Sequence, residues 1–172
     1  MTSLKTGNKV NVTKRLEILF IVVILISLGY MLYSWYENNS FTTNPLSNTI
    51  QKEIADRQDQ VLSLIRKKYN LQMDIPLVVS DEFSSQLYGL TAYKDGKITV
   101  YLNKKRFKES KNYMIEEVIP HEYAHALVIA LGERSSQDGH TQLWQDICLE
   151  LDGKICTRYV DNEEIIAQKM EF

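Results

Sequence analysis

The clearest pattern along the chain is an uninterrupted apolar run near the N-terminus. Residues 18–36 contain no charged side chain and include the stretch ILFIVVILISL. Because a helix rises about 1.5 Å per residue, this run is just long enough to cross the hydrocarbon core of a bilayer. Four aromatic side chains gather at its C-terminal end, as they do at membrane interfaces: Tyr30, Tyr33, Trp35 and Tyr36. We therefore predict one transmembrane helix over residues 16–36, after a tail of residues 1–15.

The charges on either side of this run predict its orientation. Four basic residues precede it, Lys5, Lys9, Lys14 and Arg15, against one acidic residue, Glu17. The next Lys or Arg is Lys52. By the positive-inside rule, the tail is cytoplasmic and everything after Glu37 is extracytoplasmic, in the periplasm if the cell is Gram-negative. A cleaved signal peptide would end in small rather than aromatic residues, and a buried helix of a soluble protein rarely lacks charge over this length.

The chain after the apolar run has the patterns of one α+β domain. Residues 37–47 are polar, contain one proline and are predicted to form a linker. From residue 48 to about residue 69, apolar residues recur at helical spacing, with Ser47 or Asn48 as the capping residue. We predict that the domain spans residues 48–172.

Alternating apolar residues then predict strands. The alternation over residues 71–79 indicates an extended segment, and Pro76 within it favours an edge position or a strand that begins there. Residues 90–94 and 97–102 flank an Asp-Gly dipeptide suited to a type I′ turn. This second region is therefore predicted to be a β-hairpin.

Helices are predicted to complete the domain. The basic run KKRFK at residues 104–108 is interpreted as a solvated face. A helix from about residue 112 to residue 131 stops before Gly132, and another runs from about residue 140 to residue 151. A short extended piece and a polar helix from about Asn162 follow.

The first of these helices carries the candidate chemistry. His121, Glu122 and His125 form the pattern H-E-x-x-H, which places both histidines on one helix face, one turn apart. Both imidazoles can then bind one ion, and Glu122 lies beside it as a base for water. The flanking residues are apolar, so the helix is expected to be buried, where unpartnered polar side chains would be costly.

A third ligand is suggested by the histidine count. The chain has three histidines, and the remaining one, His140, follows Gly139. We predict His140 as the third ligand, because zinc prefers imidazole among the residues available, and three protein ligands with one open position make a catalytic zinc site. Four acidic residues are alternatives: Glu133, Asp138, Asp146 and Glu150. We expect one Zn²⁺ per chain, although iron, cobalt or nickel would bind similar ligands.

Several neighbouring residues have two interpretations. Pro120 either kinks the helix or marks where its regular part begins. Trp144 either supports a metal ligand or simply packs in the core. Asp138 either orients an imidazole or caps the following helix. Cys148 and Cys156 either form a disulfide, in an oxidising compartment, or remain two buried thiols.

The runs EEVIPHEYAHALVIALG and DGHTQLW, with the upstream YLN, resemble the SprT-like metallopeptidase family. In that family a helix bearing H-E-x-x-H is followed by a loop with the third zinc-binding histidine, and an aromatic residue commonly comes next. The resemblance covers roughly residues 47–160. It implies a zincin-like fold, in which the active-site helix packs on a short antiparallel sheet with flanking helices. It also implies zinc-dependent hydrolysis of peptide bonds.

We therefore expect a membrane-anchored zinc metallopeptidase that acts on an extracytoplasmic protein or peptide, with Glu122 as the catalytic base. One alternative is an inactive, membrane-tethered zinc-binding or adaptor domain, which would not need Glu122. Another is a cytoplasmic-facing, DNA-associated protease of the kind that the family includes. The net charge of −2, the outward-facing domain and the lack of a C-terminal zinc ribbon argue against nucleic acid as a partner.

The expected mechanism places an extended peptide beside the strand at residues 98–102, as an added strand. Zinc would polarise the scissile carbonyl while Glu122 transfers a proton from water to the leaving amine. Three tyrosines are candidates for stabilising the oxyanion: Tyr88, Tyr93 and Tyr123.

Overall fold

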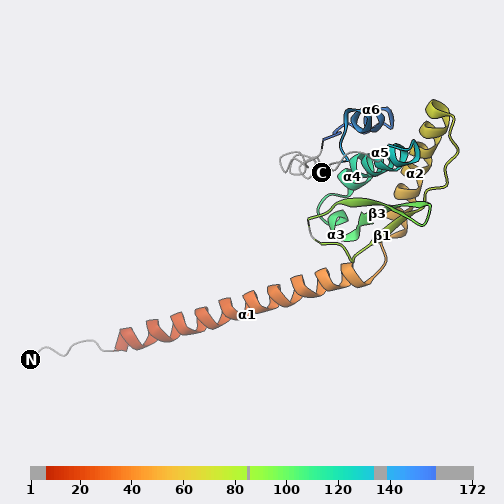
Figure 1. Ribbon diagram of the computed structural model, residues 1–172. Coiled ribbons are helices and arrows are strands. Elements are labelled where there is room, and N and C mark those ends of the chain that lie inside the picture. The colour runs from red at the N-terminus through yellow and green to blue at the C-terminus, as the bar shows by residue number, and fades with distance from the viewer. Residues whose placement is uncertain (1–6, 85, 134–138, 158–172) are drawn as a thin grey trace, which may run out of the picture. The chain divides into compact units, whose positions relative to one another are not determined.

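The computed structural model describes the backbone of residues 7–84, 86–133 and 139–157, and the side chains among them from residue 12 onward (Figure 1). The chain divides into two compact units, Met1–Pro45 and Leu46–Phe172. The polar helix expected from about Asn162, and the last part of the extended piece before it, lie outside the described residues.

The first unit is one long helix, α1 (Gly7–Thr43). Among the described residues it is the one helix long and apolar enough to cross a membrane, judged by length and composition, and its most apolar window buries no side chain within the protein. The helix also runs through most of residues 37–47, which we expected to be a linker. No Gly or Pro interrupts this segment before Pro45, whose ring disfavours helix at the residue before it. Within the expected linker, only residues 44–47 are non-helical.

The second unit begins with α2 (Asn48–Tyr69), as the hydrophobic spacing predicted. Of the two candidate caps, Ser47 has this role: its hydroxyl accepts a hydrogen bond from the backbone N–H of Ile50 at 3.4 Å. The buried apolar stripe of the helix consists of Ile54, Val61 and Ile65. The face of the helix that packs against the protein is therefore the apolar face predicted from the sequence pattern.

Three strands form one sheet in the order β1-β3-β2: β1 (Leu77–Ser80), β2 (Gly89–Lys94) and β3 (Lys97–Asn103). β1 begins directly after Pro76 and lies at an edge, so both expectations for this proline are confirmed. The predicted hairpin is formed by β2 and β3. It turns at Asp95 and Gly96 with φ angles of 52° and 79°, the positive values that a type I′ turn requires.

The sheet is mixed, whereas we expected an antiparallel one. β2 pairs with β3 in antiparallel orientation, but β1 pairs with β3 in parallel. Parallel neighbours need a crossover connection. Here the chain that leaves β1 passes to the other edge of the sheet and forms β2 there. The hairpin then places β3 between the two, antiparallel to β2 and therefore parallel to β1. Alternation along a strand does not reveal which neighbour it will pair with.

Five helical segments follow in the described chain: α3 (Lys104–Phe107), α4 (Lys111–Tyr113), η1 (Met114–Val118), α5 (Ile119–Ala130) and α6 (Gln142–Glu150). The basic run that we interpreted as a solvated face forms α3, in which Lys104 and Phe107 are buried. α4, η1 and α5 follow one another without a gap, which confirms the predicted long helix.

Pro120 lies at the start of α5, directly after the π-helical turn η1. A proline has no N–H to donate to the carbonyl four residues earlier, here that of Glu116. Arg57 of α2 replaces this donor, because its Nη2 lies 3.2 Å from the Glu116 carbonyl oxygen and 2.9 Å from that of Asp152. The proline therefore marks where the regular helix begins, and a buried arginine donates to the carbonyl that the proline cannot bond.

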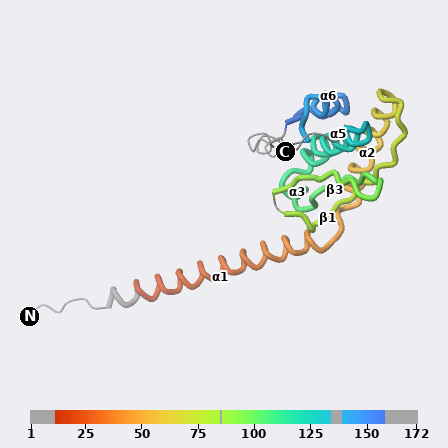
Figure 2. The backbone as a smooth tube through the Cα atoms, in the orientation of Figure 1, coloured from red at the N-terminus to blue at the C-terminus, as the bar shows by residue number. Residues whose placement is uncertain are grey.

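α5 is the central element of the second unit. It contacts α2, α6 and the strands β2 and β3, and Figures 1 and 2 show it between the sheet and α6. Five of its side chains are fully buried: Ile119, Tyr123, Ala124, Ala126 and Leu127. The expected α+β class, with the histidine-bearing helix packed on a small sheet, is confirmed.

Candidate metal centre

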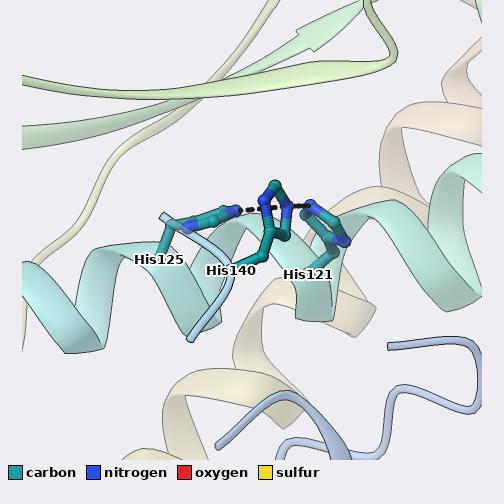
Figure 3. Close-up of side chains that lie close together, drawn as sticks. All are labelled: His121, His125 and His140. Carbon is teal, nitrogen blue, oxygen red and sulfur yellow. Dashed lines mark hydrogen bonds between the residues drawn. The ribbon is translucent and has the colours of Figure 1, made fainter. Parts of the chain in front are cut away.

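Three imidazoles converge at one point of the second unit (Figure 3). His121 and His125 lie one turn apart on α5, and His140 reaches them from the segment before α6. Nε2 of His140 lies 3.2 Å from Nε2 of His121 and 3.3 Å from Nε2 of His125. One ring nitrogen from each residue lies within 4.8 Å of the other two. The fold therefore brings the three predicted histidines together.

Hydrogen bonding alone explains this convergence poorly. Each nitrogen of a neutral imidazole carries either a hydrogen or a lone pair, so Nε2 of His140 can make a full hydrogen bond with only one of its two neighbours. A cation can accept lone pairs from all three nitrogens. Tetrahedral zinc, with bonds of about 2.0–2.1 Å, spaces its ligand atoms about 3.3 Å apart. The three histidines can thus hold a divalent metal ion.

The rings are held in the form that binds metal. Burial, and then the neighbouring imidazoles, lower the pKa of His121 to about 3. Burial, with a contribution from His140, lowers the pKa of His125 to about 4. Both rings are therefore neutral at pH 7 and present lone pairs, as metal binding requires.

His140 is placed by an irregular segment rather than by a helix. We expected the helix to begin at about residue 140, but α6 begins at Gln142. Thr141 caps it, because its hydroxyl accepts the backbone N–H three residues later at 3.2 Å. Gly139 has a φ angle of 66°, and a Cβ atom there would lie 3.4 Å from the ring of His125. A glycine therefore gives the chain both the turn and the space it needs beside the cluster.

The acidic alternatives for the third ligand do not join this cluster. Among the described residues, its ligand atoms come from the histidines alone. Asp146 accepts a hydrogen bond within α6, Glu150 accepts one from α2, and Glu133 lines the cavity described below. Asp138 lies outside the described residues, and the capping role that we considered for it belongs to Thr141.

Trp144 has both of the roles that we considered. Its side chain is 2 % exposed and so belongs to the core. It also contacts all three imidazoles: the ring is stacked on His125 and meets His121 and His140 edge-on, with centroid distances of 4.4–5.1 Å. Its Nε1 donates to the backbone carbonyl of His121 at 3.4 Å. The indole therefore restricts the orientations of the rings.

Glu122 lies beside the histidines with its carboxylate held by the sheet. Glu122 is 6 % exposed. The hydroxyl group of Thr91, on β2, lies 2.8 Å from two acceptors of this residue, the carboxylate Oε2 and the backbone carbonyl oxygen. Burial raises the pKa of Glu122 to about 7, although this hydrogen bond acts in the opposite direction. A cation among the imidazoles would also favour the ionised carboxylate. A carboxylate in this position can exchange a proton with water near neutral pH.

Gly89 leaves the space that Glu122 occupies. A Cβ atom on Gly89 would lie 2.7 Å from both Cγ and Oε1 of Glu122. Gly89 and Thr91 are two residues apart, so they share the face of β2 that meets α5. Sequence reasoning missed both residues, because nothing along the chain links a strand residue to a helix side chain some thirty positions later.

For the zinc-dependent peptide hydrolysis predicted from the sequence, we expect Gly89→Ala to lower kcat by about 10–100-fold while leaving the zinc content unchanged. The added methyl group would displace the Glu122 carboxylate, and an error of about 1 Å in the position of a catalytic group can cost 100-fold. Steady-state kinetics and metal analysis of the purified variant measure both quantities. The matched control is Gly29→Ala in α1, where an added Cβ meets no atom within 4 Å. Equal kcat values for the two variants would contradict the prediction.

A cavity of about 860 Å³ opens over the histidines. Its lining includes residues of β2, residues of α5 and two of the three tyrosines that we considered, Tyr88 and Tyr93. Tyr123 does not line it: this residue is fully buried, and its hydroxyl donates to the carbonyl of Ile75 at 2.9 Å. Tyr123 is therefore excluded as a group that could meet a ligand in this cavity.

The strand beside this cavity is β2, not β3. We expected a peptide to pair with residues 98–102, but that segment belongs to β3, the central strand, which β1 and β2 flank on either side. Both of its edges are therefore used within the sheet. β2 is an edge strand, and in the described chain its outer edge pairs with no further strand. Its residues Gly89 to Thr91 line the cavity.

Comparison with known proteins identifies one family. The model of the SprT-like family matches residues 58–163, more than half of the chain. The matched region begins within α2 and includes the sheet, α5, α6 and all three histidines. No curated protein and no solved structure matched.

Proposed function

Because this chain belongs to the SprT-like family, which indicates a metallopeptidase-like domain, we propose that it is a zinc metallopeptidase anchored in a membrane by α1. The proposed reaction is hydrolysis of peptide bonds in an extracytoplasmic protein or peptide. One observation carries the proposal: three imidazole Nε2 atoms converge beside the buried carboxylate of Glu122, at the floor of an open cavity.

Each residue of the centre has a distinct role in this proposal. His121, His125 and His140 hold the ion. When bound, zinc supplies Lewis-acid polarisation of the scissile carbonyl and lowers the pKa of water to about 7. Glu122 accepts a proton from water at its carboxylate and delivers it to the leaving amine. Thr91 keeps that carboxylate aimed at the cavity through its hydrogen bond.

The substrate in this proposal is an extended peptide paired with the outer edge of β2. Backbone groups of an edge strand can bond an added strand, and pockets beside it can read alternate side chains. Tyr88 and Tyr93 line the cavity and are the candidates for a hydrogen bond to the oxyanion.

Three observations support an extracytoplasmic position for the second unit. The apolar helix α1 has the length and composition of a membrane span. The basic residues of the N-terminal part lie before the uncharged run of α1, residues 18–36, in agreement with the positive-inside rule. Cys148 and Cys156 form a disulfide, and such bonds persist mainly in oxidising compartments.

Metal removal tests the activity directly. The full chain, purified in detergent micelles, is expected to contain one zinc ion and to cleave members of a library of unstructured peptides. Treatment with a chelator is expected to abolish cleavage, and added Zn²⁺ to restore it. Bound zinc without any cleavage would indicate a zinc-binding or adaptor domain instead, and a chain that binds no zinc would refute the proposal altogether.

A reporter fused to the C-terminus tests the orientation. A reporter that is active only outside the cytoplasm is expected to work in this fusion. Activity of a cytoplasmic reporter would place the domain inside the cell and favour a DNA-associated protease of the SprT type.

A further inference from the structure

One wall of the cavity is formed by the chain that follows α6. We call residues 153–157 the wall segment. Ile155 and Thr157 line the cavity that contains the histidines, while Cys156 between them is buried. An alternation of two is typical of extended chain, with one side turned to the cavity and the other to the protein. The wall segment therefore offers side chains to whatever occupies the cavity.

Glu117 fastens the wall segment to the central helix. Its side chain is 4 % exposed, and its Oε2 accepts the backbone N–H groups of Lys154 and Ile155, both at 2.8 Å. Hydrogen bonds to a charged acceptor are stronger than those between neutral groups. Glu117 lies four residues before His121 in the continuous helical stretch of η1 and α5. One helix therefore carries a histidine of the metal centre and sets the position of the wall relative to it.

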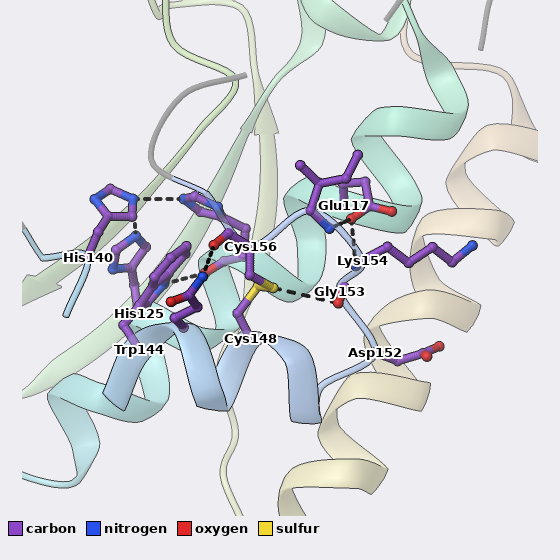
Figure 4. The surroundings of a disulfide bond; sticks show 12 residues. Glu117, His125, His140, Trp144, Cys148, Asp152, Gly153, Lys154 and Cys156 are labelled. Carbon is purple, nitrogen blue, oxygen red and sulfur yellow. Dashed lines mark hydrogen bonds between the residues drawn. A yellow bond between two sulfur atoms is a disulfide. The ribbon is translucent and has the colours of Figure 1, made fainter. Parts of the chain in front are cut away.

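A disulfide fastens the other side of the wall segment to α6 (Figure 4). Cys148 of α6 is bonded to Cys156. Gly153 passes close to this bond, because its N–H donates to the carbonyl of Cys148 at 3.0 Å and a Cβ there would lie about 3 Å from both sulfurs. Gln145 adds a hydrogen bond from Nε2 to the carbonyl of Cys156 at 3.3 Å. The same helix carries Trp144, so the wall is joined to the element that supports the imidazoles.

The surroundings of Ile155 define the chemistry of a subsite. Tyr113, Glu117 and His121 recur every four residues and so follow one face of the helical stretch. The backbone N–H of Ile155 donates a hydrogen bond to Glu117, the middle residue of the three. Tyr113 and Val118 also line the cavity. This part of the lining therefore combines the apolar side chains of Ile155 and Val118 and the ring of Tyr113 with the carboxylate of Glu117, which also lines the cavity. Such a subsite accepts an apolar side chain and disfavours an acidic one.

We propose that Ile155 is a specificity-determining residue, which selects an apolar substrate side chain close to the scissile bond. Glu117 and the Cys148–Cys156 disulfide are its positioning residues. This inference rests on the proposed function, because a specificity wall requires that the cavity binds a peptide.

The test compares cleavage preferences of full-length variants in detergent micelles, with cleavage sites in a peptide library identified by mass spectrometry. Ile155→Ala is expected to lower kcat/KM by about tenfold or more for peptides with the preferred apolar residue, because each missing methylene in such a pocket is worth about 10–200-fold. Preference at that one position is expected to shift to larger side chains. Val78→Ala is the matched control, since Val78 is 41 % exposed on β1 and does not line the cavity.

The positioning residues have a separate readout. Glu117→Gln keeps an acceptor oxygen for the two N–H groups and is expected to retain the wild-type preference. Glu117→Leu removes that acceptor and is expected to shift the preference in the same direction as Ile155→Ala, with zinc content unchanged. Reduction of the disulfide in the wild-type chain is expected to produce the same shift.

The possible outcomes separate this inference from the proposed function. A wild-type chain that cleaves no peptide refutes the proposed function, and this inference with it. A wild-type chain that cleaves peptides, beside an Ile155→Ala variant with unchanged preference and kcat/KM, overturns the specificity wall alone. A Glu117→Leu variant that matches the wild type overturns its positioning role. If Glu117→Leu does not fold, the Ile155→Ala comparison still decides.

Discussion

Replacement of Glu122 by Gln is expected to lower kcat for peptide cleavage by about 10²–10⁴-fold, the usual contribution of a general acid–base group. The amide has the shape of the carboxylate and can still accept the hydrogen bond from Thr91, so the local structure should persist. It cannot take a proton from water at neutral pH. Because the three imidazoles are untouched, the zinc content should equal that of the wild-type chain. Single-turnover kinetics and metal analysis measure the two quantities.

A second glutamate provides the control for this substitution. Glu116 lies nearby on the same helical stretch, but its side chain is 49 % exposed and lies 3.6 Å from Arg57. Glu116→Gln should leave both zinc content and kcat within a factor of about two, because this side chain does not line the cavity and Arg57 keeps its ion pair with Asp152. Comparable kcat values for Glu122→Gln and the wild type would remove Glu122 from the proposed mechanism.

Replacement of His140 by Ala is expected to lower zinc affinity by more than about 100-fold, since even residues that only support a metal ligand are worth 10–100-fold. Cleavage should be lost in parallel. The melting temperature in the presence of zinc should also fall, because a ligand stabilises the folded state in proportion to the logarithm of its concentration over Kd. Isothermal titration with Zn²⁺ and thermal unfolding with and without the metal test both effects.

Glu133→Ala is the informative comparison for this experiment. Glu133 lines the same cavity, and from the sequence it was an alternative third ligand. It lies outside the cluster of ligand atoms, so its removal should leave zinc affinity and thermal stability unchanged. The reverse pattern, in which Glu133→Ala loses zinc and His140→Ala keeps it, would contradict the assignment of the third ligand.

Local patterns predicted most of the elements correctly. The helical spacing of Ile54, Val61 and Ile65 placed α2, and the Asp95-Gly96 turn placed the hairpin. Pro76 correctly indicated the start of an edge strand. Each of these signals acts over a few residues, through backbone dihedral angles or the period of one element. Some errors lie at boundaries, where α1 extends to Thr43 and α6 begins two residues late because Thr141 is its cap. The parallel pairing of β1 with β3 was also not predicted.

In the candidate site, too, some residues could be predicted from local spacing and others could not. His121 and His125 are one turn apart on any helix, so the pair could be read from their spacing alone. His140 was chosen by its residue type, and the fold then brought it to 3.2 Å from His121. Thr91 and Gly89 had no local signal, because their relation to Glu122 exists only where β2 packs against α5. The pairing of Cys148 with Cys156 had been left open as well.

The sequence by itself determined the apolar helix, the α+β class, the pair of candidate metal ligands on one helix and the glutamate between them. These are properties of periodicity and residue chemistry, which act within one element. Only the tertiary structure decided that β3 is the central strand and β2 the edge strand beside the cavity. It also decided that Thr91 bonds Glu122 while Gly89 leaves room for it, and that Glu117 accepts hydrogen bonds from the wall segment. Those relations arise from packing between segments far apart along the chain, and the burial that selects them depends on the whole fold.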